Sequence, residues 1–181
     1  MANIQINTDL RISSICREDA TQLFDLIDSN RARLREWLGW LDKTRELKDS
    51  ISFIEFATEI ERTNGAITAG IHFQNRLVGL VSFHPIDKAT SSASVGYWVA
   101  ENASGKGIVT QSVRALVDYG FNHLNLETIY IKCATGNQKS FAIPERLGFR
   151  FEKIVPNAER LYERHVDHRV YKLSKSDWQM K

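Results

Sequence analysis

The first third of the chain carries apolar residues at three- and four-residue steps, a spacing typical of helices that pack one face against a core. One such stretch follows Asp19, and another follows Asp49 and ends at Gly65. We therefore expect two helices, with these aspartates as N-caps and the glycine as the end of the second. Ahead of them, residues 2–15 predict an initial strand.

Between the two helices, residues 31–41 are basic and then aromatic, and they have two interpretations. In one, they form the wall of a substrate cleft, because tryptophan and arginine are frequent at recognition surfaces. In the other, they form a short helix that packs apolar side chains on the core, namely Leu34, Trp37, Leu38 and Leu41.

From residue 66 onward the hydrophobic period changes to two, which indicates strands. Residues 67–73 and 77–83 are separated by Gln-Asn-Arg, so they predict a β-hairpin. Residues 93–100 predict a third strand, which leads into a glycine-containing turn.

The clearest helix pattern follows that turn, with an apolar stripe from Val109 to Leu124. A strand at 127–134 comes next, and the helix between the two strands predicts that they run parallel. Asn137 is expected to cap a short helix that ends at residues 147–148 and is kinked by Pro144. Residues 149–154 and 165–173 predict the closing strands.

Composition narrows the class of protein. The chain has 181 residues, 43% of them hydrophobic and 25% charged, which fits one domain over residues 1–181 with a core from about 9 to 178. A net charge of +2 gives no general attraction to nucleic acid, and no apolar run is long enough to cross a membrane. We expect a cytoplasmic protein, because the N-terminal residues lack a signal-peptide pattern.

Cysteine and histidine usage predicts no metal site. Cys16 and Cys133 are far apart, form no CxxC motif, and are expected to be reduced thiols. His165 and His168 form an isolated HxxH, which is weak support for a metal without further ligands.

The turn at residues 102–110 reads Asn-Ala-Ser-Gly-Lys-Gly-Ile-Val-Thr and opens the long helix. Such a turn exposes backbone N–H groups at a helix N-terminus, which suits a pyrophosphate. It matches neither the nucleotide P-loop nor the GxGxxG fingerprint, since Thr110 stands where the third glycine belongs. On its own, the turn is equally well explained as a plain connection between a strand and a helix.

The surrounding motifs resemble the GCN5-related N-acetyltransferases (GNAT). They are Asn-x-x-Gly-x-Gly at 102–107, Asn-x-x-Ser at 137–140 and Glu-Arg-Leu-Gly-Phe at 145–149, in that order around the helix. Residues 34–40 and 166–171 resemble the RimJ/RimL branch, whose known members acetylate the N-terminal amines of ribosomal proteins. The resemblance covers nearly the whole chain.

This resemblance implies an α+β fold: a mostly antiparallel, twisted sheet with a splayed parallel strand pair, flanked by helices. Acetyl-CoA would lie in the splay, with its pyrophosphate on the glycine turn and its pantetheine paired with a strand edge. A backbone N–H there could also polarise the thioester carbonyl. The implied cofactor-binding residues are Trp98, Val99, Ser104, Gly105, Lys106, Gly107, Ile108, Val109, Thr110, Asn137 and Ser140.

The resemblance also implies direct transfer to an amine, without a covalent acyl-enzyme. Ser140 is the candidate acid for the leaving thiolate, with a plain first-turn serine as the alternative. Relatives often carry a glutamate where this chain has Ser94, so the general base stays open. A water chain or an amine that arrives neutral are alternatives to the candidates His84, Glu101, Glu163, Asp167 and His168.

The acceptor is expected to be a protein or peptide N-terminus. A polyamine, an aminoglycoside or another small amine is the alternative, and a catalytically weak acyl-CoA-binding module is a third reading. An acidic peptide groove would predict a cationic cluster of Arg31, Arg33 and Arg35. A homodimer could form through exposed tryptophans, of which Trp37, Trp40 and Trp178 are candidates unless they are buried in the core.

Overall fold

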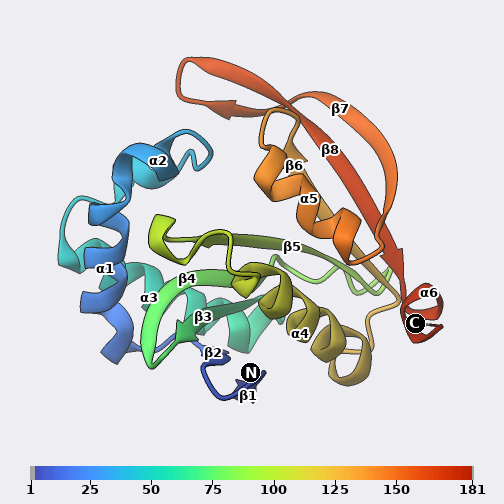
Figure 1. Cartoon of the computed structure of the whole chain (residues 1–181), viewed down its shortest axis with the longest axis horizontal. Helices are drawn as coiled ribbons and strands as arrows, with labels where there is room; N and C mark the ends of the chain where they lie inside the picture. Colours follow the sequence, from blue (N-terminus) through green and yellow to red (C-terminus); the bar gives the residue numbers. More distant parts are fainter. Residues whose placement is uncertain (1–2, 181) are drawn as a thin grey trace.

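The computed structural model describes residues 3–180, whose strands form one open sheet in the order β1-β2-β3-β4-β5-β6-β8-β7 (Figure 1). Every neighbouring pair is antiparallel except β5 and β6, which run parallel. This is the predicted α+β architecture. The strands are β1 (Ile4–Gln5), β2 (Leu10–Ser14), β3 (Ile67–Phe73), β4 (Arg76–Phe83), β5 (Ser92–Val99), β6 (Thr128–Ala134), β7 (Arg150–Leu161) and β8 (Arg164–Ser174).

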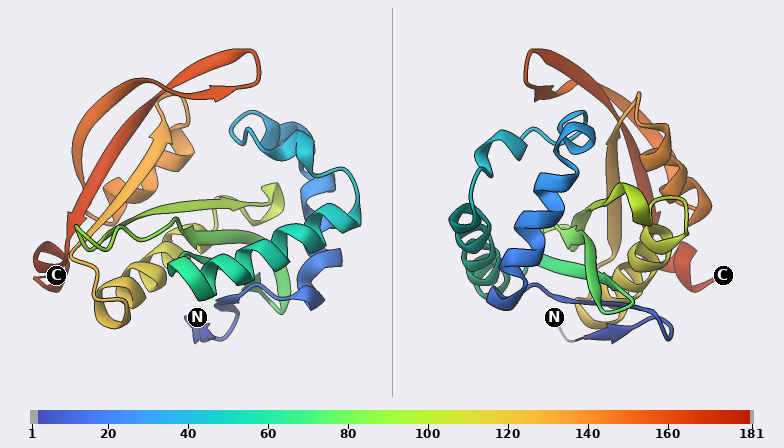
Figure 2. Two further views of the ribbon diagram at one scale, coloured as in Figure 1. Left: turned by 180° about the vertical axis from the view of Figure 1, so that it is seen from behind. Right: turned by 60° about the vertical axis from the view of Figure 1, so that its left-hand side comes forward.

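Helices cover both faces of the sheet, and a hydrophobic core lies under each layer (Figure 2). We call these the α1/α3 face and the α4/α5 face. The helices are α1 (Ala20–Ser29), α2 (Arg31–Arg35), α3 (Leu47–Asn64), α4 (Ile108–His123), α5 (Gln138–Arg146) and α6 (Lys175–Gln179), with 3-10 turns η1 (Arg17–Asp19), η2 (Leu41–Lys43) and η3 (Glu101–Ala103).

The pattern-based predictions hold best where local chemistry decides the structure. Gly65 ends α3 in the left-handed region, at φ 70°. The β3–β4 hairpin turns at Gln74 and Asn75, both with positive φ. The Asn137 side chain accepts a hydrogen bond from the Ser140 N–H at 3.1 Å, and it therefore caps α5 as predicted.

The N-cap prediction is wrong for Asp49, and for Asp19 it is right in position but not in the side-chain hydrogen bond. α3 begins at Leu47, so Asp49 lies inside its first turn and is not the N-cap. The carboxylate of Asp49 instead accepts hydrogen bonds from the N–H groups of the two residues before the helix. Asp19 does occupy the N-cap position of α1, but its carboxylate accepts from the Cys16 N–H and closes η1.

The closing hairpin is longer than its hydrophobic pattern predicts. β7 continues past Ile154 to Leu161, across Pro156 and Asn157, which are residues that usually end a strand. A shift in register between Val155 and Glu159 takes up these residues as an irregularity, so the strand pairing resumes beyond them. α5 likewise runs through Pro144 to Arg146.

The basic and aromatic segment after α1 is tied down by Arg31. Its guanidinium donates to the carbonyl oxygens of Leu41 at 3.2 Å and Thr44 at 2.8 Å, and to the carboxylate of Asp28. Leu34 and Leu41 are buried, as the core interpretation requires, whereas Trp37 and Leu38 are only partly buried. Arg31 therefore fixes the path of the chain between α2 and α3.

The tryptophans considered for a dimer surface have contacts within the chain. The indole N–H of Trp178 donates to Asp118 at 2.6 Å, and Trp37 lies under the guanidinium of Arg164. Trp40 is 38% exposed. None of the helices within residues 3–180 has the length and apolar character needed to span a membrane.

Replacing Arg31 with alanine should lower the free energy of unfolding by about 1–3 kcal/mol, because two backbone carbonyls lose a charged donor. Arg17 is the matched control, since its ion pair with Glu55 is exposed and exposed pairs contribute about 0–1 kcal/mol. Urea unfolding of both alanine variants measures the difference. Equal losses would contradict the role assigned to Arg31.

Candidate active site

The parallel pairing of β5 and β6 stops partway along both strands. Its last pair is Val95 beside Ile131. Beyond that pair, β5 continues to Val99 with β4 as its partner, and β6 continues to Ala134 with β8 as its partner. The strands therefore diverge into a V, which we call the opening, closed at Val95 and Ile131 (Figure 1).

One edge of the opening is an unpaired strand edge. The N–H of Ala100 donates to the carbonyl of Val78 at 2.8 Å, so the even-numbered residues at this end of the chain face β4. Successive residues of a strand direct their backbone groups to opposite sides. The N–H and C=O groups of Tyr97 and Val99 therefore face the opening, where no strand pairs with them.

Trp98 and Val99 have different positions, although both are predicted to bind pantetheine through the backbone. The backbone of Trp98 faces β4, and its indole lies on the α1/α3 face with its ring centre 6.4 Å from that of Trp40. Val99 turns its backbone to the opening, and its carbonyl accepts a hydrogen bond from Arg33 at 3.1 Å.

The glycine turn exposes a run of backbone donors just after η3. Gly105 and Gly107 have φ of 78° and 73°, in the left-handed region that favours glycine. The first bond of the α4 ladder joins the Gln111 N–H to the Gly107 carbonyl at 3.0 Å. Within residues 3–180, no hydrogen bond uses the N–H groups of residues 105–110, which we call the cradle.

Ser104 belongs to the same predicted set but is positioned differently. Its N–H donates to the Glu101 carbonyl at 3.0 Å, so only its side chain and carbonyl stay available. Lys106 is exposed next to the cradle. A concave group of free N–H donors at the N-terminus of a helix is an anion site.

Ser140 lies beside the opening on the α4/α5 face. The hydroxyl of Tyr97 donates to the Ser140 carbonyl at 2.9 Å, and the Ser140 hydroxyl lies 3.4 Å from the Tyr97 oxygen. The N–H of Ser140 is held by Asn137 at the start of α5. Contacts with Tyr97 of β5 and with Asn137, the N-cap of α5, therefore position Ser140.

Burial sets the protonation of the groups around Ser140. It raises the pKa of the Tyr97 hydroxyl well above its ordinary range, despite the contact with Ser140, which acts in the opposite direction. It also raises the pKa of the Cys133 thiol to about 11. Both groups are therefore neutral at pH 7.

The candidate bases occupy different places. His84 follows β4, with its ring on the α1/α3 face beside β5, and desolvation and the charge of Lys132 lower its pKa. His168 pairs with Glu159 at 3.1 Å. Asp167 accepts from the Asn157 N–H. Both remaining candidates, Glu101 and Glu163, are exposed.

The tip of the β7–β8 hairpin reaches the segment between α2 and η2 (Figure 2). The Tyr162 hydroxyl donates to the Leu38 carbonyl at 2.9 Å, and the Arg164 guanidinium donates to the Glu36 carbonyl at 2.6 Å. Arg35 lies 3.8 Å from the centre of the Tyr162 ring. These contacts connect the β7–β8 hairpin with the segment between α2 and η2, and the two lie on either side of the opening.

The proposed cationic cluster does not form a shared surface. Arg31 is bound to Asp28 and backbone carbonyls, Arg33 to the Val99 carbonyl, and Arg35 to the carboxylate of Asp42. Each guanidinium therefore has its own partner in the chain.

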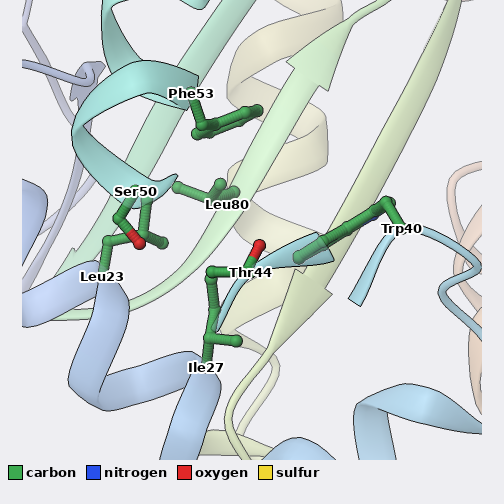
Figure 3. Close-up of a pocket in the computed structure, with 7 residues that line it drawn as sticks. All are labelled: Leu23, Ile27, Trp40, Thr44, Ser50, Phe53 and Leu80. Carbon is green, nitrogen blue, oxygen red and sulfur yellow. The ribbon is translucent and has the colours of Figure 1, made fainter. Parts of the chain in front are cut away.

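A small apolar cavity lies away from the opening, on the α1/α3 face (Figure 3). Its volume is about 30 Å³. The Ser50 hydroxyl on its wall is buried without a partner among the described residues. Within residues 3–180, no group of three or more His, Cys, Asp or Glu side chains could hold a metal ion. The lining residues are Leu23, Ile27, Trp40, Thr44, Ser50, Phe53 and Leu80.

Sequence reasoning missed several members of this site. Tyr97 could have been found, since it alternates with Val95 and Val99 on the buried side of a predicted strand. The pairing of Glu159 with His168 could not, because the irregularity in β7 sets which residues of that strand approach β8.

Comparison with known proteins agrees with this geometry. The GNAT acetyltransferase domain matches residues 9–150. YdaF of Bacillus subtilis (strain 168), named provisionally as a ribosomal N-acetyltransferase, is 33% identical over 99% of this chain and 98% of its own.

Two solved structures share the fold over almost their full length. The ribosomal L7/L12 alpha-N-protein acetyltransferase RimL in complex with coenzyme A has a TM-score of 0.93 at 26% identity, covering 97% of this chain and 99% of its own. The microcin C7 self-immunity acetyltransferase MccE, in complex with acetyl-CoA and AMP, has a TM-score of 0.90 at 31% identity, covering 94% and 95%.

The open strand edge, the cradle and these matches lead to one conclusion. The chain belongs to the GNAT acetyltransferase family and is an acetyl-CoA-dependent N-acetyltransferase.

Proposed function

We propose that this chain transfers the acetyl group of acetyl-CoA to the N-terminal amine of a ribosomal or other protein, by direct attack within a ternary complex. The geometry of the opening carries the proposal. Free N–H groups of the cradle lie past its wide end. The unpaired edge at Tyr97 and Val99 leads inward from there to the Ser140 hydroxyl.

The residues of the cradle and of β5 fit the donor. The free N–H groups of residues 105–110 and the dipole of the 16-residue α4 both favour a pyrophosphate. The edge of β5 can pair with the amides of a pantetheine as an added strand. Because Arg33 already donates to the Val99 carbonyl, the N–H of Val99 and the backbone of Tyr97 are the groups left for that pairing. The exposed Lys106 can approach the phosphates.

In this reaction the task of the protein's side chains is to transfer protons. Acetyl-CoA supplies an activated thioester, on which a neutral amine displaces the CoA thiolate. The Ser140 hydroxyl, held on the α4/α5 face by Tyr97 and Asn137, is the group we assign to protonate that thiolate. Cys133 is unsuited to a covalent route, since its pKa of about 11 leaves the thiol protonated at neutral pH.

The acceptor class rests on the relatives. YdaF and RimL, whose names refer to ribosomal proteins, match this chain over nearly their whole length.

An acceptor panel tests the proposed substrate. Acetyl-CoA is incubated with the protein and with N-terminal peptides of ribosomal proteins, spermidine or an aminoglycoside, and the release of free thiol is followed. We expect release with peptides only, with the acetyl group on the α-nitrogen by mass spectrometry.

The matched control is the same peptide with a formylated N-terminus and an internal lysine, which should give no release. Turnover of spermidine or the aminoglycoside instead of the peptides would contradict the proposed acceptor. Tight binding of acetyl-CoA with no turnover of any amine would favour an acyl-CoA-binding module.

Substituting Gly105 tests the cradle. Gly105→Asp should weaken acetyl-CoA binding by about 10- to 100-fold, because a carboxylate would face the pyrophosphate. Gly105→Asn is the matched control, as asparagine has nearly the same shape and tolerates the same left-handed backbone without the charge. Among the described residues, apart from the two chain neighbours, no heavy atom lies within 4 Å of a Cβ at this position, so neither variant is blocked by packing.

Calorimetric titration with acetyl-CoA measures both Gly105 variants. A loss that is equal for aspartate and asparagine would mean that shape, not charge, decides, and would count against a pyrophosphate there.

Substituting Ser140 tests the acid. Ser140→Ala should lower kcat by about 10²-fold and leave the KM for acetyl-CoA within about threefold, because the hydroxyl acts on the leaving group. The backbone contacts to Asn137 and Tyr97 survive the change. Ser112→Ala is the control, since that buried hydroxyl in α4 has no partner among the described residues. An unchanged kcat in Ser140→Ala would remove the serine from the mechanism.

A further inference from the structure

The imidazole of His84 lies against the closed end of the opening. A Cβ built on Gly96 would lie 2.9 Å from the His84 Nε2 and 3.4 Å from the Ser82 hydroxyl. Gly96 leaves room for the ring in this position, and a larger residue would require the ring to move. Gly96 is the first residue of β5 past the last parallel pair, so the ring covers the point at which the strands begin to diverge.

His84 and Ser140 are on opposite faces of the sheet. Gly96 shares its face with Trp98, which packs in the α1/α3 core. Tyr97 points the other way, into the α4/α5 core, where its hydroxyl meets Ser140. A carbonyl group at the closed end of the opening would therefore have a hydroxyl on one side and an imidazole on the other.

The surroundings keep the imidazole neutral. The imidazole lies beside Gly96 of β5, on the side where the uncharged Ser82 of β4 also approaches, and the backbone N–H of His84 donates to the Ser94 carbonyl at 2.9 Å. From β6, Lys132 contributes a positive charge. Desolvation, followed by this charge, lowers the pKa of His84 below its ordinary value, so the ring can accept a proton at pH 7.

An acceptor amine arrives mostly protonated at neutral pH, since an α-amino group has a pKa of about 7.7–8.0. Attack needs the nitrogen lone pair, so one proton must leave first. His84 is an exposed residue, so its ring can exchange a proton with solvent.

We infer that the Nε2 of His84 takes this proton from the acceptor amine, which makes His84 the general base of the reaction. The inference rests on the proposed function, because it assumes an amine acceptor at this face. Of the three protons on the ammonium, one stays on the amide nitrogen. A second reaches the CoA sulfur through Ser140 as the C–N bond forms and the C–S bond breaks. The third is taken by His84 and released to solvent.

The other histidine near the opening is less suited to this step. The ring of His168 is paired with the carboxylate of Glu159 at 3.1 Å and belongs to the β7–β8 hairpin. No comparable partner engages the ring nitrogens of His84 among the described residues.

The test is the pH dependence of kcat in His84→Gln, measured with saturating acetyl-CoA and acceptor. Wild-type kcat should fall with one ionisation as the pH drops through the lowered pKa of His84, because protonation removes the base. The variant should be about 10²-fold slower near pH 7. The deficit should shrink to below about tenfold at pH 9, where the acceptor amine loses its proton unaided.

Two further measurements separate catalysis from structure. His123→Gln is the matched control, since that exposed histidine near the end of α4 should give the wild-type profile. Adding imidazole to His84→Ala should restore part of kcat, and only above the pKa of imidazole. Calorimetry with acetyl-CoA checks that each variant is folded and binds the donor. A deficit that is constant from pH 6 to 9 and not rescued would overturn the inference.

This experiment can fail independently of the proposed function. If wild type acetylates peptides and His84→Gln matches it at every pH, the inference is wrong and the proposed function stands. If wild type acetylates only a small amine, the proposed acceptor is wrong, and the His84 profile is measured with that amine instead.

Discussion

The site depends on one constraint: β5 and β6 pair with each other only as far as Val95 and Ile131. Backbone N–H and C=O groups in a protein interior need partners, so an open strand edge is unusual. Here each strand is held on its other side, β5 by β4 and β6 by β8, and neither collapses onto the other. The sheet can therefore present unpaired backbone groups to a ligand without losing its integrity.

The divergence also separates the chemistry by face. Because successive residues of β5 face opposite sides of the sheet, the Tyr97 side chain points to one helix layer and the open side of Gly96 faces the other. The Ser140 hydroxyl is held on the α4/α5 face by contacts from two elements. His84 fills the space that Gly96 leaves on the α1/α3 face. A donor in the opening would thus have the Ser140 hydroxyl on one side and the His84 imidazole on the other.

The sequence predicts best the elements that have a long and regular pattern, and it is least accurate at their ends. The alternation in β3 and β4 and the stripe of α4 are long and regular, so burial and period agree and the elements are as expected. The pattern places the N-cap of α3 at Asp49, three residues after the actual N-cap Glu46, because several polar residues in this stretch could cap a helix. β7 was predicted to end too early, since Pro156 normally breaks a strand and only its pairing with β8 carries it onward.

The sequence by itself determined the cradle. The left-handed φ of Gly105 and Gly107 and the free N–H groups at the start of α4 follow from local chemistry, which neighbouring residues set. Only the tertiary structure decided which distant groups meet at the opening: His84 over Gly96, and Tyr97 with Ser140. Such contacts depend on strand register and on the packing of layers. A periodic pattern states which face a residue takes, but not which residue lies opposite.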